Sequence, residues 1–255
     1  MSNDALIQVR HLTARYGDNV ILDDVSLDVY RGEILAILGG SGCGKSTLMR
    51  HMVGLNRPFA GTVVIDGVDL NACPLAAYQR TLRKIGVLFQ SSALFGSMTL
   101  RENIALPIAE FSGLESAEIE TLIRMKLSLV DLSGTEGLLP SELSGGMKKR
   151  AGLARAMALN PKILFLDEPS AGLDPVISAE IDELILHINR SIGTTMVIVT
   201  HELDSVFNVA QRVVMLDADV KGIIAEGNPR ELRDHSDNPI VVNFFQRKPS
   251  RTGSV

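Results

Sequence analysis

A glycine-rich segment near the start of the chain has the residue types needed to hold phosphate groups. It reads GGSGCGKST, fits the pattern G-x-x-x-x-G-K-[ST], and lies between the apolar run EILAIL and the helix-forming run STLMRHMVGL. Glycines let the backbone turn so that successive N–H groups face a phosphate, and the following helix adds its positive end. The alternative is a plain glycine turn before a helix. We favour a nucleotide site formed by Gly39, Gly40, Ser41, Gly42, Cys43, Gly44, Lys45, Ser46 and Thr47.

Two carboxylates end a second apolar run and suit the chemistry of ATP hydrolysis. The run ILFLDEP places Asp167 and Glu168 where open α/β sheets bind their ligands. In this interpretation Lys45 reaches the β- and γ-phosphates of ATP, while Ser46 and Asp167 hold Mg²⁺. Glu168 then polarises the attacking water. The simpler alternative, acidic residues in the first turn of a helix, is weakened by the presence of the glycine loop.

A third motif, LSGGM at positions 143–147, predicts a second anion site. Ser144, Gly145 and Gly146 precede the run KKRAGLARAMAL, and a helix N-terminus with small residues suits a γ-phosphate. The glycine loop already surrounds the phosphates of one nucleotide. The second site therefore most simply serves ATP held by another copy, which predicts a head-to-tail dimer with two-fold symmetry. A serine N-cap followed by flexible glycines is the alternative. The next residues, Lys148, Lys149 and Arg150, are expected to form a solvated helix face.

The hydrophobic pattern indicates the elements that position these motifs. Alternating stretches, IQVRHLTARYG and VILDDVSLDVYRGE, predict a small antiparallel sheet. The continuous apolar runs EILAILG, IGVLFQ, ILFLD and MVIVT are typical of parallel strands covered by helices on both faces. Between Phe89 and Asn160 the spacing is helical. We expect an α/β fold with a mostly parallel sheet, an N-terminal antiparallel β-subdomain and an α-helical subdomain inserted at about 91–160. Residues 236–255 are expected to form a C-terminal extension of the 1–235 domain.

Composition excludes several other classes of protein. The 255 residues carry a net charge of −5, which gives no electrostatic footprint for nucleic acid. Two cysteines are too few for a disulfide framework, so a reducing compartment is expected. The N-terminus has no signal-peptide pattern, and the apolar runs fall short of the ~20 residues that a spanning helix needs.

With these motifs in this order, the chain resembles the ATP-binding subunits of ABC transporters, built on a P-loop NTPase core, from about Ile7 to Leu232. The resemblance implies ATP and Mg²⁺ as cofactors and catalysis by Glu168, His201, Gln90 and Lys45. It also implies that Tyr16 stacks on adenine, that Gln90 links Mg²⁺ to the membrane partner, and that His201 contacts the γ-phosphate. Asp174, in SAGLD, would cross the dimer seam with Ser144, Gly145 and Gly146. Each of these side chains also has an ordinary structural explanation.

One position departs from the pattern of many family members, which have glutamine where this chain has Met147. A thioether cannot replace the hydrogen bonds of an amide, but the anion site depends on Ser144 and on backbone N–H groups, so activity should survive. Together with FQSSALFGSMTLRENIALP and EPSAGLDP, the segment LSGGMKKRAGLARA resembles the Mla-type, MCE-associated branch. That branch implies phospholipid transport between the bacterial inner and outer membranes. It also implies a peripheral location on the cytoplasmic face of the inner membrane, an integral-membrane permease, an MCE-domain lipid carrier and a small accessory protein.

A docking groove for the permease is expected after Gln90, at Leu94, Phe95, Met98 and Leu100, although the same residues could form a core. Three other functions stay open. The chain could power a small-solute or drug transporter, since the same ATPase serves any cargo. It could be a soluble ABC protein that acts on ribosomes or DNA, although it has one cassette and an acidic balance. A phosphoryl transferase is disfavoured by LSGG.

Overall fold

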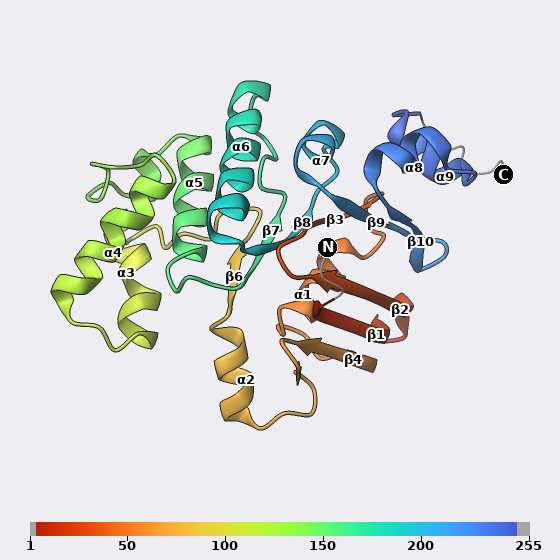
Figure 1. Cartoon of the computed structure of the whole chain (residues 1–255), viewed down its shortest axis with the longest axis horizontal. Coiled ribbons are helices and arrows are strands. Elements are labelled where there is room, and N and C mark those ends of the chain that lie inside the picture. The colour runs from red at the N-terminus through yellow and green to blue at the C-terminus, as the bar shows by residue number, and fades with distance from the viewer. Residues whose placement is uncertain (1–3, 249–255) are drawn as a thin grey trace.

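Two β-sheets packed face to face form the body of the molecule, and helices cover the outer face of the larger sheet (Figure 1). The computed structural model describes residues 4–248. The smaller sheet is four-stranded with the order β2-β1-β4-β5, and the larger is six-stranded with the order β10-β9-β3-β8-β7-β6. The strands are β1 Ala5–Tyr16, β2 Asn19–Tyr30, β3 Ile34–Gly39, β4 Ala60–Ile65, β5 Val68–Asp69, β6 Ile85–Leu88, β7 Ile163–Asp167, β8 Thr195–Val199, β9 Arg212–Asp217 and β10 Gly222–Gly227.

The larger sheet is parallel except at its β10 edge, as the sequence predicts. The runs expected as buried parallel strands are β3, β6, β7 and β8, and β9 joins them in parallel beside β3. The expected antiparallel sheet contains β1 and β2, and it also includes β4 and β5. The strands β4, β5, β9 and β10 were not expected from the sequence. The apolar run VVML within β9 is like the runs that were predicted, so this strand was overlooked, whereas β5 has only two residues and shows no periodicity.

Alternate residues of the parallel strands face two different cores, since successive side chains on a strand point to opposite faces. On β7, Ile163 and Phe165 pack toward the antiparallel sheet and α1, whereas Leu164 and Leu166 pack against helices. All four are fully buried. The helices are α1 Lys45–Met52, α2 Leu75–Leu82, α3 Leu100–Phe111, α4 Ser116–Leu129, the 3₁₀ turn η1 Pro140–Glu142, α5 Gly145–Ala156, α6 Pro175–Ile192, α7 Leu203–Val209, α8 Pro229–His235 and α9 Pro239–Phe245.

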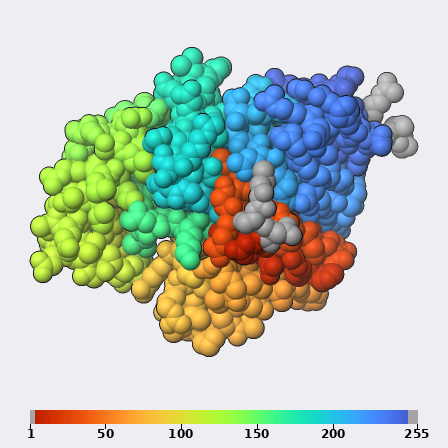
Figure 2. All heavy atoms as spheres, viewed as in Figure 1, coloured from red at the N-terminus to blue at the C-terminus, as the bar shows by residue number. Residues whose placement is uncertain are grey.

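Helices α3, α4 and α5 form a lobe beside α6, at the left of both views (Figures 1 and 2). The helix α3 begins with a capping box, in which Thr99 and Glu102 each satisfy a backbone N–H of the other. Residues 89–160 are all described and contain no strand, as predicted. The core of the lobe is continuous with the core under α6, so the lobe packs firmly on the main sheet. The division of the chain into a 1–235 domain and an extension stays a prediction.

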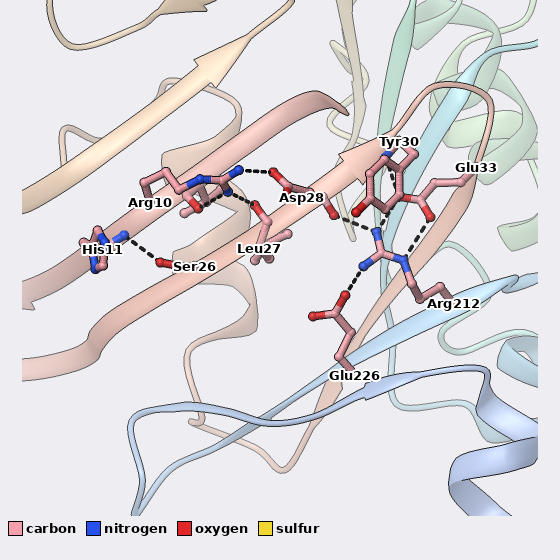
Figure 3. A network of polar contacts seen from close by, with 10 residues as sticks. Arg10, His11, Ser26, Leu27, Asp28, Tyr30, Glu33, Arg212 and Glu226 are labelled. Atoms are coloured by element: carbon pink, nitrogen blue, oxygen red, sulfur yellow. Dashed lines mark hydrogen bonds and ion pairs between the residues drawn. The ribbon is translucent and has the colours of Figure 1, made fainter. Parts of the chain in front are cut away.

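Arg212 of β9 joins the two sheets (Figure 3). Its guanidinium donates to Glu33 Oε1 at 2.6 Å and to the carbonyl oxygen of Asp28 at 2.6 Å, and it also pairs with Glu226. The Tyr30 ring lies 4.9 Å from the guanidinium carbon. Because Glu33 is buried, this pairing satisfies a carboxylate that would be costly to leave alone.

Asp66 makes a second junction between the sheets. Its carboxylate accepts from Lys84 at 2.6 Å, Arg31 at 2.7 Å and Lys162 at 3.0 Å. Lys84 and Lys162 immediately precede β6 and β7, so this junction fixes the amino ends of two parallel strands to the antiparallel sheet. The three cations hold the pKa of Asp66 well below its usual range.

The C-terminal helices α8 and α9 pack on the main sheet rather than projecting from it. Val241 and Phe245 of α9 are buried in a third core with residues of β3, β9 and α7. Phe245 also packs against the Phe207 ring, with 5.7 Å between ring centroids. Arg247 pairs with Asp204 of α7 at 2.8 Å. The last part of the predicted extension, residues 249–255, lies outside the described residues.

Candidate active site

The glycine loop has the backbone shape that a phosphate cradle requires. Gly39, Gly42 and Gly44 have φ values of 142°, 79° and 101°, which residues other than glycine rarely adopt. A Cβ at Gly39 would also lie 2.3 Å from the carbonyl oxygen of Leu216. Lys45 Nζ lies against the loop and donates to the Gly39 and Gly40 carbonyl oxygens at 2.8 Å each. The ammonium is therefore held against the loop that is predicted to bind phosphate.

The other residues of the loop divide into exposed and buried positions. Ser41 and Ser46 are exposed, and Thr47 is half-buried. The Cys43 side chain is buried beneath the loop, and this burial raises the pKa of its thiol. Cys43 can therefore serve a phosphate only through its backbone N–H.

The strands β6, β7, β8 and β3 bring the predicted catalytic residues to one edge of the sheet. These strands are parallel neighbours in the order β3-β8-β7-β6, so their carboxyl ends lie side by side. Gln90 follows β6, Asp167 ends β7 and Glu168 follows it, His201 follows β8, and the glycine loop begins at the end of β3. The topology thus brings these side chains together although they are far apart in sequence.

Glu168 is held on both carboxylate oxygens. Oε1 lies 2.7 Å from His201 Nδ1, and Oε2 accepts from the Thr200 hydroxyl at 3.2 Å. Its backbone N–H donates to the Val199 carbonyl oxygen at 2.8 Å, and its φ of 49° is uncommon for a residue with a side chain. The carboxylate is thereby fixed in direction. Thr200 was not predicted as a site residue; its only signal in the sequence is its place at the end of MVIVT, directly before His201.

Asp167, next to Glu168, has a perturbed acidity. Burial, and then the neighbouring Glu168 charge, raise the pKa of Asp167. A divalent cation in this position would reverse that effect and favour the ionised form. With Ser46 and Gln90, Asp167 would give an all-oxygen ligand set that suits Mg²⁺. Among residues 4–248, no cluster of three His, Cys, Asp or Glu side chains that could hold a metal is found.

The LSGG motif lies at the N-terminus of α5, apart from the glycine loop. Ser144 is the N-cap, and its hydroxyl accepts from the Met147 N–H at 3.3 Å. Gly146 packs closely on α6, because a Cβ there would lie 2.7 Å from Ile177 Cγ2. Met147 packs into the helical core, whereas Ser144 and Gly145 are exposed. Helix α1 packs on β1, β3 and β8, whereas α5 packs on α3, α4, α6 and β6. The two predicted anion sites therefore lie on separate parts of the chain.

Tyr16 and Asp174 lie in positions compatible with their predicted roles. Tyr16 ends β1 and is 52% exposed, which leaves its ring free to stack. Asp174 caps α6 by accepting from the N–H groups of Val176 and Ile177 at 3.0 and 3.1 Å. Stacking on adenine and contact across a dimer seam both stay predictions.

The expected solvated run after LSGG is wrong at Lys149. Its side chain is buried, and Nζ donates to the backbone carbonyl oxygens of Gln90 and Glu168 at 2.7 Å each. Arg150 is also mostly covered, through ion pairs with Asp131 and Glu180 at 2.8 Å each. Charge alone could not reveal this burial, since the Lys–Lys–Arg run has no hydrophobic periodicity.

Of the four residues predicted to contact a permease, Phe95 lines a cavity, and contact with a permease stays a prediction. A mainly apolar cavity of about 780 Å³ is lined by residues of β6, α3 and α5, including Phe89, Phe95, Leu106, Phe111 and Arg155. Phe95 is half exposed. Leu94 and Met98 are half-buried and are not among the residues that line this cavity. The prediction is wrong for Leu100, whose side chain is fully buried in the helical core.

Comparisons with known proteins show which family the chain resembles. The family model described as ABC transporter matches residues 22–171. The chain is 39% identical to the intermembrane phospholipid transport system ATP-binding protein MlaF of Haemophilus influenzae, over 94% of this chain and 90% of that protein. It is 43% identical to a probable ribonucleotide transport ATP-binding protein of Mycobacterium leprae, over 94% of this chain and 68% of that protein.

The chain thus spans about two thirds of the length of that mycobacterial relative. A dimeric ATP-binding cassette solved in a post-hydrolysis state with ADP and phosphate superposes with a TM-score of 0.78, at 29% identity over 87% of this chain and 98% of that one. Within residues 4–248 we find no helix whose length and apolar character would let it span a bilayer. The match over more than half of the chain, together with the site geometry, shows that the protein belongs to the ABC transporter family of ATPases.

Proposed function

We propose that two copies of the chain bind two MgATP molecules at their interface and that hydrolysis drives a membrane permease. One observation carries the dimer. The chain holds a phosphate cradle at the end of β3 and a separate exposed helix N-terminus at Ser144, and these lie on different elements. A second copy turned by two-fold symmetry would place its Ser144 on the γ-phosphate held by the first. The dimeric form of the solved relative supports this arrangement.

The chemistry follows from the residues at the sheet edge. Lys45 and the loop N–H groups would bind the β- and γ-phosphates, and Ser46, Gln90 and Asp167 would hold Mg²⁺, which supplies charge neutralisation when bound. Glu168 would accept a hydrogen bond from the attacking water, because His201 and Thr200 fix its two oxygens. The exposed imidazole of His201 would stabilise charge on the γ-phosphate.

Substitutions at Glu168 and Lys45 test this assignment. Glu168→Gln should bind ATP, dimerise more persistently and hydrolyse at least about a hundredfold more slowly, because the amide is a much weaker base. Lys45→Ala should lose ATP affinity. Nucleotide binding and turnover are measured on the full chain, with light scattering for the dimer. Turnover of Glu168→Gln at the wild-type rate would exclude Glu168 as the water-orienting group.

For the cargo, we propose phospholipid moved between the bacterial inner and outer membranes. The support is the match to MlaF over most of both chains, together with the LSGGMKKRAGLARA segment. The chain would then sit on the cytoplasmic face of the inner membrane, bound to an integral-membrane permease, with an MCE-domain lipid carrier and a small accessory protein. The complex should co-purify with phospholipid, and its ATPase activity should respond to phospholipid in reconstituted vesicles.

A small-solute transporter is the second candidate. It is favoured by the higher identity, 43%, to the relative named for ribonucleotide transport. ATPase stimulation of the reconstituted complex by a ribonucleotide, with no response to phospholipid composition, would select this function.

The apolar cavity beside Phe95 would receive a short helix of the permease. An apolar helix face can lodge there without leaving polar groups unpaired. Phe95→Glu should spare folding and ATP binding of the isolated chain but prevent co-purification with the permease. Met125→Glu is the matched control, since Met125 is 61% exposed on α4 and lies outside the cavity. Loss of assembly in both variants would contradict this docking site.

A further inference from the structure

Lys149 of α5 connects this helix to the segments that follow β6 and β7, called below the Gln90 loop and the Glu168 loop. We propose that Lys149 is a positioning residue for ATP hydrolysis, whose ammonium fixes the Gln90 loop and the Glu168 loop to the helix that carries Ser144. The inference rests on the proposed function, because it takes the roles of Gln90, Glu168 and Ser144 from it.

Burying the charge of Lys149 costs free energy. The Lys149 side chain is 6% exposed, and burial lowers the pKa of its ammonium. Both hydrogen-bond acceptors found for it in residues 4–248 are backbone carbonyls, Gln90 O and Glu168 O. A buried lysine is costly to keep unless its donors are satisfied, and here two short charge-assisted bonds satisfy two of its three N–H donors. A hydrophobic residue would fill this space at lower cost if packing were the only requirement.

The two carbonyls that accept from Lys149 lie at the carboxyl ends of parallel strands. Each belongs to a residue just after a parallel strand, β6 for Gln90 and β7 for Glu168. A hydrogen bond to a carbonyl fixes the peptide plane of that residue, and the plane in turn sets the direction of its side chain. Lys149 thus holds the backbone from which Gln90 and Glu168 extend.

Helix α5 makes further contacts with the Gln90 loop. Arg155 donates to the carbonyl oxygens of Ser92 and Ala93 at 3.1 and 2.7 Å. Gly152 allows close approach, since a Cβ there would lie 3.0 Å from Ser92 Cβ. Of these contacts, only that of Lys149 also reaches Glu168. Through Lys149, a change in the position of α5 would act on the backbone of Glu168 as well as on that of Gln90.

The test compares Lys149→Met, Lys149→Gln and Lys126→Met in the full chain. Lys126 is the matched control because it is equally buried, at 6% exposure, but donates to Asn160 Oδ1 away from the catalytic edge. Bound nucleotide is counted by equilibrium binding so that kcat refers to folded sites. We expect Lys149→Met to lower kcat by about tenfold or more, with KM and ATP affinity within about twofold of wild type. Lys149→Gln keeps two N–H donors and should recover part of kcat. Lys126→Met should lower Tm and keep kcat.

Two results would overturn the inference. One is a kcat of Lys149→Met within twofold of wild type. The other is equal losses in Lys149→Met and Lys149→Gln that follow the fall in Tm and recur in Lys126→Met. Glu168→Gln is measured in parallel. If Glu168→Gln is inactive and either of these two results is found, only the role of Lys149 is refuted. Wild-type turnover in Glu168→Gln would instead refute the proposed function.

Discussion

Removing the charge of Asp66 should destabilise the protein in a pH-dependent way. Asp66→Asn replaces an acceptor that serves Arg31, Lys84 and Lys162 with a neutral amide of the same size. The three cations are 32–52% exposed and can rehydrate, whereas Asp66 itself is 13% exposed. Each pair is therefore worth about 0.2–1 kcal/mol, and the loss should total about 1–3 kcal/mol at neutral pH.

The sign of the pH dependence follows from the lowered pKa of Asp66. A carboxylate whose folded pKa lies below its unfolded value stabilises the protein above the unfolded pKa, and the effect is lost as pH falls through the folded pKa. The difference between wild type and Asp66→Asn should thus be constant from about pH 7 to 5 and shrink below about pH 4, the ordinary range of aspartate.

Urea unfolding followed by circular dichroism across this pH range measures the difference. For a chain of this size, 1 kcal/mol corresponds to about 2–4 °C in Tm, which thermal scans can confirm. Asp204→Asn is the control, because the Asp204–Arg247 pair is 86% and 65% exposed and should contribute little. A difference for Asp66→Asn that stays constant down to pH 3, or that is no larger than the control, would refute the reasoning.

Two further predictions concern α3 and α5. Leu100→Ala should cost about 2–5 kcal/mol in urea unfolding, since it empties a fully buried site in the helical core, and a neutral outcome would instead point to an exposed contact role. Ser144→Ala removes the N-cap of α5, so the free energy of unfolding should fall by about 1 kcal/mol. ATP-driven dimerisation, followed by light scattering, should fall much further if Ser144 binds a partner's phosphate. Equal, small effects in both assays would show that Ser144 acts only as a helix cap.

Much of the fold could be predicted from local patterns. The apolar runs that became β3, β7 and β8 are buried on both faces, and β6 is buried on one face and half-buried on the other, so their composition is distinctive. The motif residues at the ends of these strands follow from the same patterns, because parallel neighbours align their carboxyl ends. Family resemblance added Tyr16, Gln90, Asp174 and His201, which periodicity cannot single out.

The remaining features depend on contacts between distant segments. Whether Lys149 is solvated or buried is decided by the loops after β6 and β7, which lie 59 and 19 residues away from it in sequence. The same holds for Leu100, which looks like a groove residue beside Phe95 but turns into the core of α3 and α4. Thr200 gains its role only when β8 lies beside β7.

The close approach of Gly146 to Ile177 gives the LSGG motif a meaning independent of any nucleotide. A methyl group on residue 146 would collide with Ile177 Cγ2, so the small residue is needed for α5 and α6 to pack within a single chain. The two positions should therefore change together during evolution or design: alanine at 146 becomes acceptable only when residue 177 becomes smaller. A motif normally taken to indicate ligand binding therefore also serves, at this position, the packing of two helices.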